Sequence, residues 1–178
     1  MLVKIYQVFT LGVEICEDLW LPNAPSNELA LNGATVICNT SASNELTAKK
    51  DYRRNLVSMQ SAKLVSGYIY SNAGSGESTT DVVFSGHHLI CENGTIINES
   101  TGFDAEVIYG DLDVEKLISE RRKMTTYQSH HEYDYVYFDM DLIDIETNHY
   151  YDPHPLFQVI LHFVNYVVKK SLKFKQEV

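Results

Sequence analysis

One cysteine of this chain stands where enzymes commonly place a nucleophile. Cys16 ends an apolar stretch, residues 3–16, and begins the more polar segment CEDLW. A junction between a strand and a turn exposes a side chain while rigid backbone fixes its position, which suits covalent catalysis. The carboxylates of Glu14 and Glu17 disfavour the thiolate, so such a site needs a cation and a proton acceptor from elsewhere in the fold. By spacing alone, a buried strand cysteine is the better interpretation.

Two other patterns could hold a metal or a phosphate, and both are weak. The histidine doublets His87-His88 and His130-His131 cannot each give two rings to one metal, because adjacent strand residues point to opposite faces. Neither HExxH nor CxxC occurs. The loop GSGEST, residues 74–79, lacks the lysine of a GxxxxGK[ST] phosphate loop. The sequence therefore predicts no metal site and a flexible surface loop here.

Short strands and helices alternate along the chain and must position these residues. Runs of β-branched and aromatic residues predict strands over 3–16, with a break near Gly12, and over 35–39, 68–73, 82–84 and 106–112. Helical spacing and start signals predict helices over 26–33, 47–67 and 113–124. An Asn93-Gly94 tip predicts a hairpin. This alternation is typical of a layered α/β domain.

The last quarter of the chain has a different pattern. Residues 133–145 alternate polar and apolar side chains, as an edge strand with one solvated face does. From Pro155 on, apolar residues at helical spacing precede a basic end, which predicts an amphipathic C-terminal helix. A helix that binds a membrane surface or a partner is the alternative interpretation.

Composition and charge limit the partners. The 178 residues carry a net charge of -10, which argues against nucleic acid and anionic membranes and is compatible with a small polar metabolite. No apolar run reaches the roughly 18 residues of a membrane span, and no signal peptide is recognised, so we expect a cytoplasmic protein. Three cysteines in a chain of this length indicate free thiols rather than a disulfide framework.

Longer strings of the sequence resemble one family. They are GVEICEDLW (12–20), PSNELALNGATVICNTSASNE (25–45), KKDYRR (49–54), SGYIYSNAGSGESTTDVVFSGHHLICENGTII (66–97) and DLDVEKLISERRKMTT (111–126). In this order they are similar to the nitrilase-type (carbon-nitrogen hydrolase) glutaminase domain of glutamine-dependent NAD+ synthetases. The resemblance extends from about residue 12 to residue 127.

The resemblance implies hydrolysis of the glutamine amide through a cysteine thioester, with the ammonia used to make NAD+. By position, Cys16 matches the nucleophile and the backbone N–H of Glu17 an oxyanion donor. Ser43 and Lys49 match residues that bind glutamine, and Lys49 replaces the Arg of some members, so a single charge would hold the α-carboxylate. Trp20 and the Glu17 side chain match the pocket wall. Without the resemblance, Ser43 would be a loop cap and Lys49 part of a solvated helix face.

The resemblance also implies a four-layer α-β-β-α sandwich that is incomplete, with its N-terminal half missing. Residues 1–110 match the C-terminal half of the glutaminase domain, residues 111–153 a helix and edge-strand extension, and residues 154–178 form a divergent helix. The catalytic Glu and Lys of the family lie upstream of its cysteine, and nothing in this chain matches them. No SGGxDS nucleotide loop occurs, so we expect ATP and magnesium only in a synthetase domain and no cofactor in this chain.

The expected partners are L-glutamine, the synthetase domain, an N-terminal half-domain and further copies of the chain. Open sheet edges would make the chain marginally stable alone or prone to self-association. Two alternatives to a glutaminase stay open. One is a catalytically silent fragment that acts only in folding or oligomerisation, which the unmatched Glu and Lys favour. The other is a different nitrilase-superfamily amidase, which GESTTD and ERRKMTT disfavour.

Overall fold

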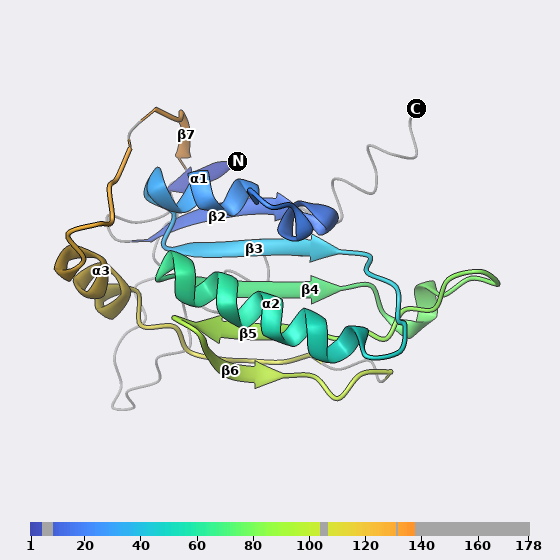
Figure 1. Ribbon diagram of the computed structural model, residues 1–178. Coiled ribbons are helices and arrows are strands. Elements are labelled where there is room, and N and C mark those ends of the chain that lie inside the picture. The colour runs from blue at the N-terminus through green and yellow to red at the C-terminus, as the bar shows by residue number, and fades with distance from the viewer. Residues whose placement is uncertain (5–8, 104–106, 131, 138–178) are drawn as a thin grey trace, which may run out of the picture. The chain divides into compact units, whose positions relative to one another are not determined.

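The computed structural model describes residues 1–4, 9–103, 107–130 and 132–137 (Figure 1). The chain divides into two units, Met1–Asp139 and Met140–Val178, and the second lies outside the described residues. The described part of the first unit contains one sheet of seven strands in the order β6-β5-β4-β3-β2-β1-β7. No helix within these described ranges has the length and apolar character that crossing a bilayer requires.

The sheet is mixed, with a parallel centre. Strands β2, β3 and β4 run parallel to one another, β7 runs parallel to β1, and the other neighbouring pairs are antiparallel. Parallel neighbours end at the same edge of the sheet, so the carboxyl ends of β2, β3 and β4 meet. The strands are β1 Leu2–Lys4, β2 Thr10–Ile15, β3 Val36–Ser41, β4 Gly67–Asn72, β5 Leu89–Glu92, β6 Thr95–Glu99 and β7 Tyr135–Tyr137.

Two α-helices cover one face of this sheet (Figure 1). The helix α1 packs on β2 and β3, and α2 packs on β4 and β5, where their apolar side chains bury the core. The core comprises Leu2, Leu19, Leu29, Ala30, Ala34, Ile37, Val57, Leu64, Tyr68, Tyr70, Leu89 and Cys91. The helical segments are the 3-10 turn η1 Cys16–Trp20, α1 Pro25–Leu31, α2 Lys49–Leu64, the 3-10 turn η2 Ser75–Glu77 and α3 Val114–Lys123.

The three predicted helices and the hairpin are confirmed. Pro25 begins α1 in the first helical position, where its missing N–H costs nothing. Asp113 caps α3 by accepting a 2.9 Å hydrogen bond from the Lys116 amide. Asn93 and Gly94 have φ values of 44° and 86°, as a tight two-residue hairpin turn requires.

Three strand predictions are wrong. Gly12 does not break a strand but lies inside β2, where an added Cβ would meet Ile37 Cδ1 at 2.8 Å. Residues 82–84 form no strand, because the carbonyls of Val82 and Val83 accept hydrogen bonds from loop amides, including one of 2.7 Å from Glu45 to Val83. Residues 107–112 are also irregular, and Leu112 packs against Gly67 instead. In each case tertiary packing decides over local preference.

The described residues supply one sheet and one helical layer of the expected nitrilase-type sandwich. Strand β7 lies at the sheet edge, as predicted, and accounts for residues 135–137 of the predicted strand 133–145. Residues 138–145 and the predicted C-terminal helix, residues 154–178, lie outside the described residues.

Candidate active site

Polar side chains gather at the carboxyl ends of the three parallel strands. Glu14 of β2 is paired in register with Asn39 of β3, which is paired with Tyr70 of β4. Two residues further on, the chain reaches Cys16 after β2, while Ser41 pairs with Asn72. Because residues two apart on a strand share a face, Ser41 and Asn72 lie on the same side of the sheet as Asn39 and Tyr70. Ligands of open α/β sheets bind at this end of the strands.

Cys16 has a constrained backbone. Its φ of 52° lies in the left-handed region, which costs a residue other than glycine about 1–3 kcal/mol and persists only where neighbouring groups hold it. The side chain of Asn39 holds this conformation from both sides, accepting from the Cys16 amide at 3.1 Å and donating to its carbonyl at 3.3 Å. Ser41 donates to the same Asn39 oxygen at 2.8 Å. The turn that presents the thiol is therefore fixed by the neighbouring strand.

The three cysteines differ in exposure. Cys16 is half-buried, whereas Cys38 and Cys91 are buried. Burial raises the pKa of Cys38 and of Cys91 to about 12, because desolvation disfavours the thiolate. Cys38 and Cys91 therefore match the strand-cysteine interpretation, and Cys16 does not.

Glu14, two residues before Cys16, links β2 to neighbouring elements. Its carboxylate is 2% exposed and accepts hydrogen bonds from the Ser26 amide at 2.8 Å and from the Tyr68 hydroxyl. Burial, followed by the charge of Glu14, raises the pKa of Tyr68 well above its usual value, so Tyr68 donates as a neutral phenol. These partners tie Glu14 to α1 and β4.

Ser43 is held by its neighbours on β4 and α2. Its amide donates to Asn72 Oδ1 at 2.8 Å, and its carbonyl accepts from Asn72 Nδ2 at 3.0 Å. Its hydroxyl accepts from Arg53 Nη2 at 3.4 Å. A buried loop residue is thus fixed at three points beside the end of the parallel strands.

Lys49 and Trp20 lie together at the start of α2. The Lys49 ammonium donates to Asn44 Oδ1 and lies 5.6 Å from the centre of the Trp20 ring, within cation-π range. Tyr52, one turn along α2, stacks on Trp20 with ring centroids 5.2 Å apart. Glu17 is exposed in the same η1 turn as Trp20. The structure thus joins Lys49 to Trp20, and Asn44 links Lys49 to the loop that carries Ser43.

Sequence reasoning missed three residues of this constellation, namely Asn39, Asn72 and Arg53. Arg53 belongs to the basic start of the predicted helix, yet its side chain is fully buried. Asn39 and Asn72 end buried strands, and a polar residue at the carboxyl end of a strand is the signal that could have found them.

Tyr70 is a fourth such residue, and it is the partner of Asn39 in the register of β3 and β4. Its hydroxyl is buried and has no hydrogen-bond partner among the described residues. Burial raises the pKa of Tyr70, while the Ser41 hydroxyl and the Arg53 charge act in the opposite direction. Tyr70 is therefore a neutral phenol at neutral pH.

The histidines are engaged in separate contacts. His87 lies between Arg53 and Glu99, and Nδ1 of His88 accepts from the Asn72 amide at 3.1 Å. His131, His149 and His154 lie outside the described residues. Within the part of the chain that the structure describes, no three His, Cys, Asp or Glu side chains gather in a way that could hold a metal ion.

The chain is similar to proteins of known class. The model of the carbon-nitrogen hydrolase family matches residues 3–122. The glutamine-dependent NAD(+) synthetase of Mycobacterium tuberculosis is 45% identical over 121 residues, which cover 67% of this chain and 18% of that protein. The chain therefore spans about a fifth of the length of the curated relatives it matches.

Solved structures share its fold. A carbon-nitrogen hydrolase from Helicobacter pylori aligns with a TM-score of 0.57 at 22% identity, over 67% of this chain and 45% of that one. A glutamine-dependent NAD+ synthetase from Acinetobacter baumannii aligns with a TM-score of 0.54 at 22% identity, over 60% of this chain and 20% of that one. These alignments show a nitrilase-type fold, and the family match over residues 3–122 shows that this chain belongs to the carbon-nitrogen hydrolase family.

Proposed function

We propose that this chain carries part of the glutamine-hydrolysing site of a glutamine-dependent NAD+ synthetase, with Cys16 as its nucleophile. The observation that carries the proposal is the geometry of Cys16, whose left-handed turn at the end of β2 is held on both sides by Asn39. The 45% identity to the Mycobacterium tuberculosis enzyme supports the choice of glutamine over other amides.

The proposed reaction has two steps. The Cys16 sulfur attacks the carboxamide carbon of glutamine, the C–N bond breaks, and ammonia leaves with the proton that the thiol gave up. Water then attacks the thioester carbon, the C–S bond breaks, and glutamate and the free thiol are released. The Glu17 amide N–H is the proposed donor to the oxyanion that forms in each step. The general base and the oxyanion lysine of the family have no match in this chain, and we assign neither role to its residues.

The proposed glutamine-binding residues come from the loop between β3 and α2 and from η1. Ser43 would bind the backbone groups of glutamine, and Lys49 would hold the α-carboxylate as a single charge. Trp20 and the Glu17 side chain would form the wall of the site. The contacts of Lys49 with Trp20 and Asn44 support a common site for these residues.

In this proposal the ammonia passes to a synthetase domain that binds ATP and magnesium, and the protein forms homo-oligomers. Neither ATP nor magnesium would bind the residues described above. A silent fragment stays the second candidate, since the sequence offers no match for the Glu and Lys of the family.

Intact mass after incubation with a diazo-ketone analogue of glutamine tests the proposal, with Cys16→Ala in parallel. An adduct on the wild type alone would support a glutamine site with a reactive Cys16. An adduct on both proteins would overturn the assignment of the nucleophile. No adduct on protein that is shown to be folded by circular dichroism would contradict the activity for this chain and favour the silent fragment.

A further inference from the structure

Arg53 is a buried cation beside the candidate glutamine site. It lies in the second turn of α2, and its side chain is 0% exposed, whereas that of its neighbour Arg54 is 47% exposed. A buried charge is costly unless ion pairs and hydrogen bonds compensate it. The ion pair and hydrogen bonds of Arg53 must therefore compensate the cost of burying its charge.

The guanidinium holds three consecutive loop residues. Nη2 donates to the Ser43 hydroxyl and to the Asn44 carbonyl, both at 3.4 Å. Nη1 and Nη2 donate to the Glu45 carboxylate at 3.2 and 3.3 Å, and Ser85 donates to the same oxygen at 2.7 Å. A planar fork with fixed donors can set the positions of several acceptors at once, which a lysine cannot do.

A second set of contacts, with His87 and through it with Glu99, fixes the Arg53 side chain. Nη1 lies 2.9 Å from His87 Nδ1, and because arginine only donates, this histidine nitrogen accepts. The other ring nitrogen then carries the proton and donates to Glu99 Oε1 at 2.9 Å. Burial lowers the pKa of His87, so the neutral ring that this arrangement needs is the form present at neutral pH.

Arg53 makes no hydrogen bond to Cys16 among the described residues, but it bonds the loop that carries a proposed glutamine ligand. Of the three residues that Arg53 bonds, Ser43 is itself a proposed glutamine ligand. Asn44 accepts a hydrogen bond from Lys49, which is also a proposed glutamine ligand. We propose that Arg53 is a positioning residue, which sets the geometry of the segment Ser43–Glu45 and thereby the affinity of the site for glutamine. This inference rests on the proposed function for its effect on glutamine, but its effect on the segment can be measured without any activity.

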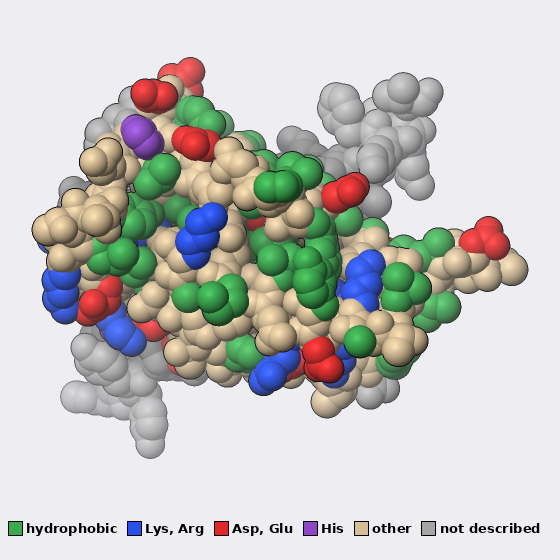
Figure 2. Space-filling model, viewed as in Figure 1, with side chains coloured by type: hydrophobic (Ala, Val, Ile, Leu, Met, Phe, Trp, Pro, Cys, Tyr) green, Lys and Arg blue, Asp and Glu red, His purple; other side chains and the backbone are tan. Residues whose placement is uncertain are grey.

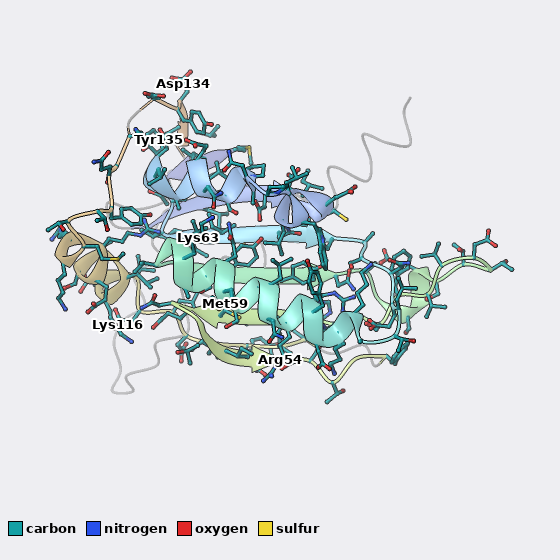
Figure 3. The ribbon with its side chains drawn as sticks, viewed as in Figure 1. Arg54, Met59, Lys63, Lys116, Asp134 and Tyr135 are labelled. Atoms are coloured by element: carbon teal, nitrogen blue, oxygen red, sulfur yellow. The ribbon has the colours of Figure 1, made fainter. Side chains whose placement is uncertain are left out.

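The test compares Arg53→Lys, which keeps the charge and loses the fork, with the matched control Arg54→Lys. Arg54 is the adjacent arginine on α2, and its exposed side chain donates a hydrogen bond to Glu99 of β6 (Figure 3). Amide hydrogen exchange is followed at Ser43 and Glu45, whose N–H groups bond Asn72 and Val83. We expect exchange about tenfold or more faster in Arg53→Lys, as the loss of charged hydrogen bonds implies, and unchanged in Arg54→Lys. Unchanged exchange in Arg53→Lys would overturn the proposal.

Labelling kinetics separate positioning of the site from general damage. In Arg53→Lys we expect the apparent affinity for the diazo-ketone analogue to weaken about tenfold, while its maximal labelling rate and the rate with iodoacetamide, which needs no glutamine site, stay unchanged. A fall in the maximal rate at constant affinity would overturn the proposed role. If the wild type takes up no analogue, the proposed function fails, and hydrogen exchange alone decides whether Arg53 positions the segment.

A second variant covers the case in which Arg53→Lys does not fold. Glu45→Gln keeps the size of the side chain and removes the charge that orients the guanidinium. We expect the same faster exchange at Ser43 in this variant. Wild-type exchange at Ser43 in folded Glu45→Gln would contradict the positioning role of the ion pair.

Discussion

At the scale of single residues, the three thiols should react very differently. Burial raises the pKa of Cys38 and Cys91 to about 12, so almost no thiolate forms at pH 8, whereas Cys16 is half-buried at a turn. We expect iodoacetamide to modify the native wild type once and native Cys16→Ala not at all, as read by intact mass. In denaturant the same proteins should take up three and two groups, respectively. Rapid labelling of native Cys16→Ala would contradict the burial of the other two thiols.

Asn39 offers a second residue-scale prediction. Replacing Asn39 by Ala removes the acceptor of the Cys16 amide and the donor to its carbonyl, in the middle of a buried polar row. We expect the free energy of unfolding to fall by about 1–3 kcal/mol, measured by urea denaturation, because buried groups lose their partners. Labelling of Cys16 by the glutamine analogue should slow as well.

The exposed Asn23 provides the control, since among the described residues its side chain makes a single hydrogen bond, accepted from Asn27 at the surface. Asn23→Ala should change stability by less than about 0.5 kcal/mol. Equal losses in the two variants would show that Asn39 does not hold the turn in the way proposed.

Residue types alone could indicate only part of this site. Cys16, Ser43, Lys49 and Trp20 lie in strings that resemble a family. The structure places Lys49 beside Trp20 and links it through Asn44 to the loop that carries Ser43. Arg53 could not be predicted, because in the sequence it is one of several cations at a helix start. Only the packing of α2 on the sheet decides that this one side chain is buried.

At the scale of elements, the fit between α1, β2 and β3 depends on a glycine. A Cβ on Gly12 would lie 2.8 Å from Ile37 Cδ1, 3.0 Å from Ala34 Cβ and 3.2 Å from Leu29 Cβ. We expect Gly12→Ala to lower the free energy of unfolding by about 1–3 kcal/mol through overpacking, measured by urea denaturation.

Gly76 is the matched control for this prediction. It lies in the η2 turn with no heavy atom within 4 Å of an added Cβ, so Gly76→Ala should be close to neutral. A tolerated Gly12→Ala would mean that α1 can move away from β2 at little cost.

The elements that could be predicted carry their own local signals. The start of α3 follows from the Asp113 cap, and the hairpin from Asn93-Gly94, since both act within a few residues. Residues 82–84 and 107–112 are as rich in β-forming residue types as the strands of the sheet, yet contacts with residues distant in the sequence determine their conformation. The Glu45 amide donates to the Val83 carbonyl, and Leu112 packs against Gly67.

At the scale of the whole molecule, hydrophobic side chains are exposed on the helical face (Figure 2). Leu21, Tyr52 and Met59 are 49%, 58% and 66% exposed. We expect the isolated chain to self-associate in a concentration-dependent way, measured by sedimentation velocity. A monomer at every concentration with one sharp two-state melt would contradict this expectation.

The response of stability to pH is also a property of the whole fold. We expect it to depend on His87, which lies between Arg53 and Glu99. Burial lowers the pKa of His87 below its ordinary 6.5, despite the opposing hydrogen bond that His87 donates to Glu99, and the nearby Arg53 and Lys50 charges lower it further. Between the pKa of His87 in the folded chain and its pKa of about 6.5 in the unfolded chain, the unfolded chain binds more protons, so the free energy of unfolding rises with pH. The contribution of His87 to stability is therefore lost as the pH falls below about 6.5. Burial alone would raise the pKa of Glu99, but its bonds to His87 and Arg54 outweigh burial and lower it, which adds a further loss below about pH 4.5.

Urea midpoints measured from pH 7.5 to pH 5 test this assignment. The wild type should lose stability progressively on acidification, because protonating His87 forces a donor against the Arg53 guanidinium. In His87→Gln, which cannot take up that proton, the dependence on pH over this range should flatten, while the loss that belongs to Glu99 persists at lower pH. If His87→Gln kept the wild-type slope, acid would act elsewhere in the fold, and the neutral ring between Arg53 and Glu99 would not be the element that acid disrupts.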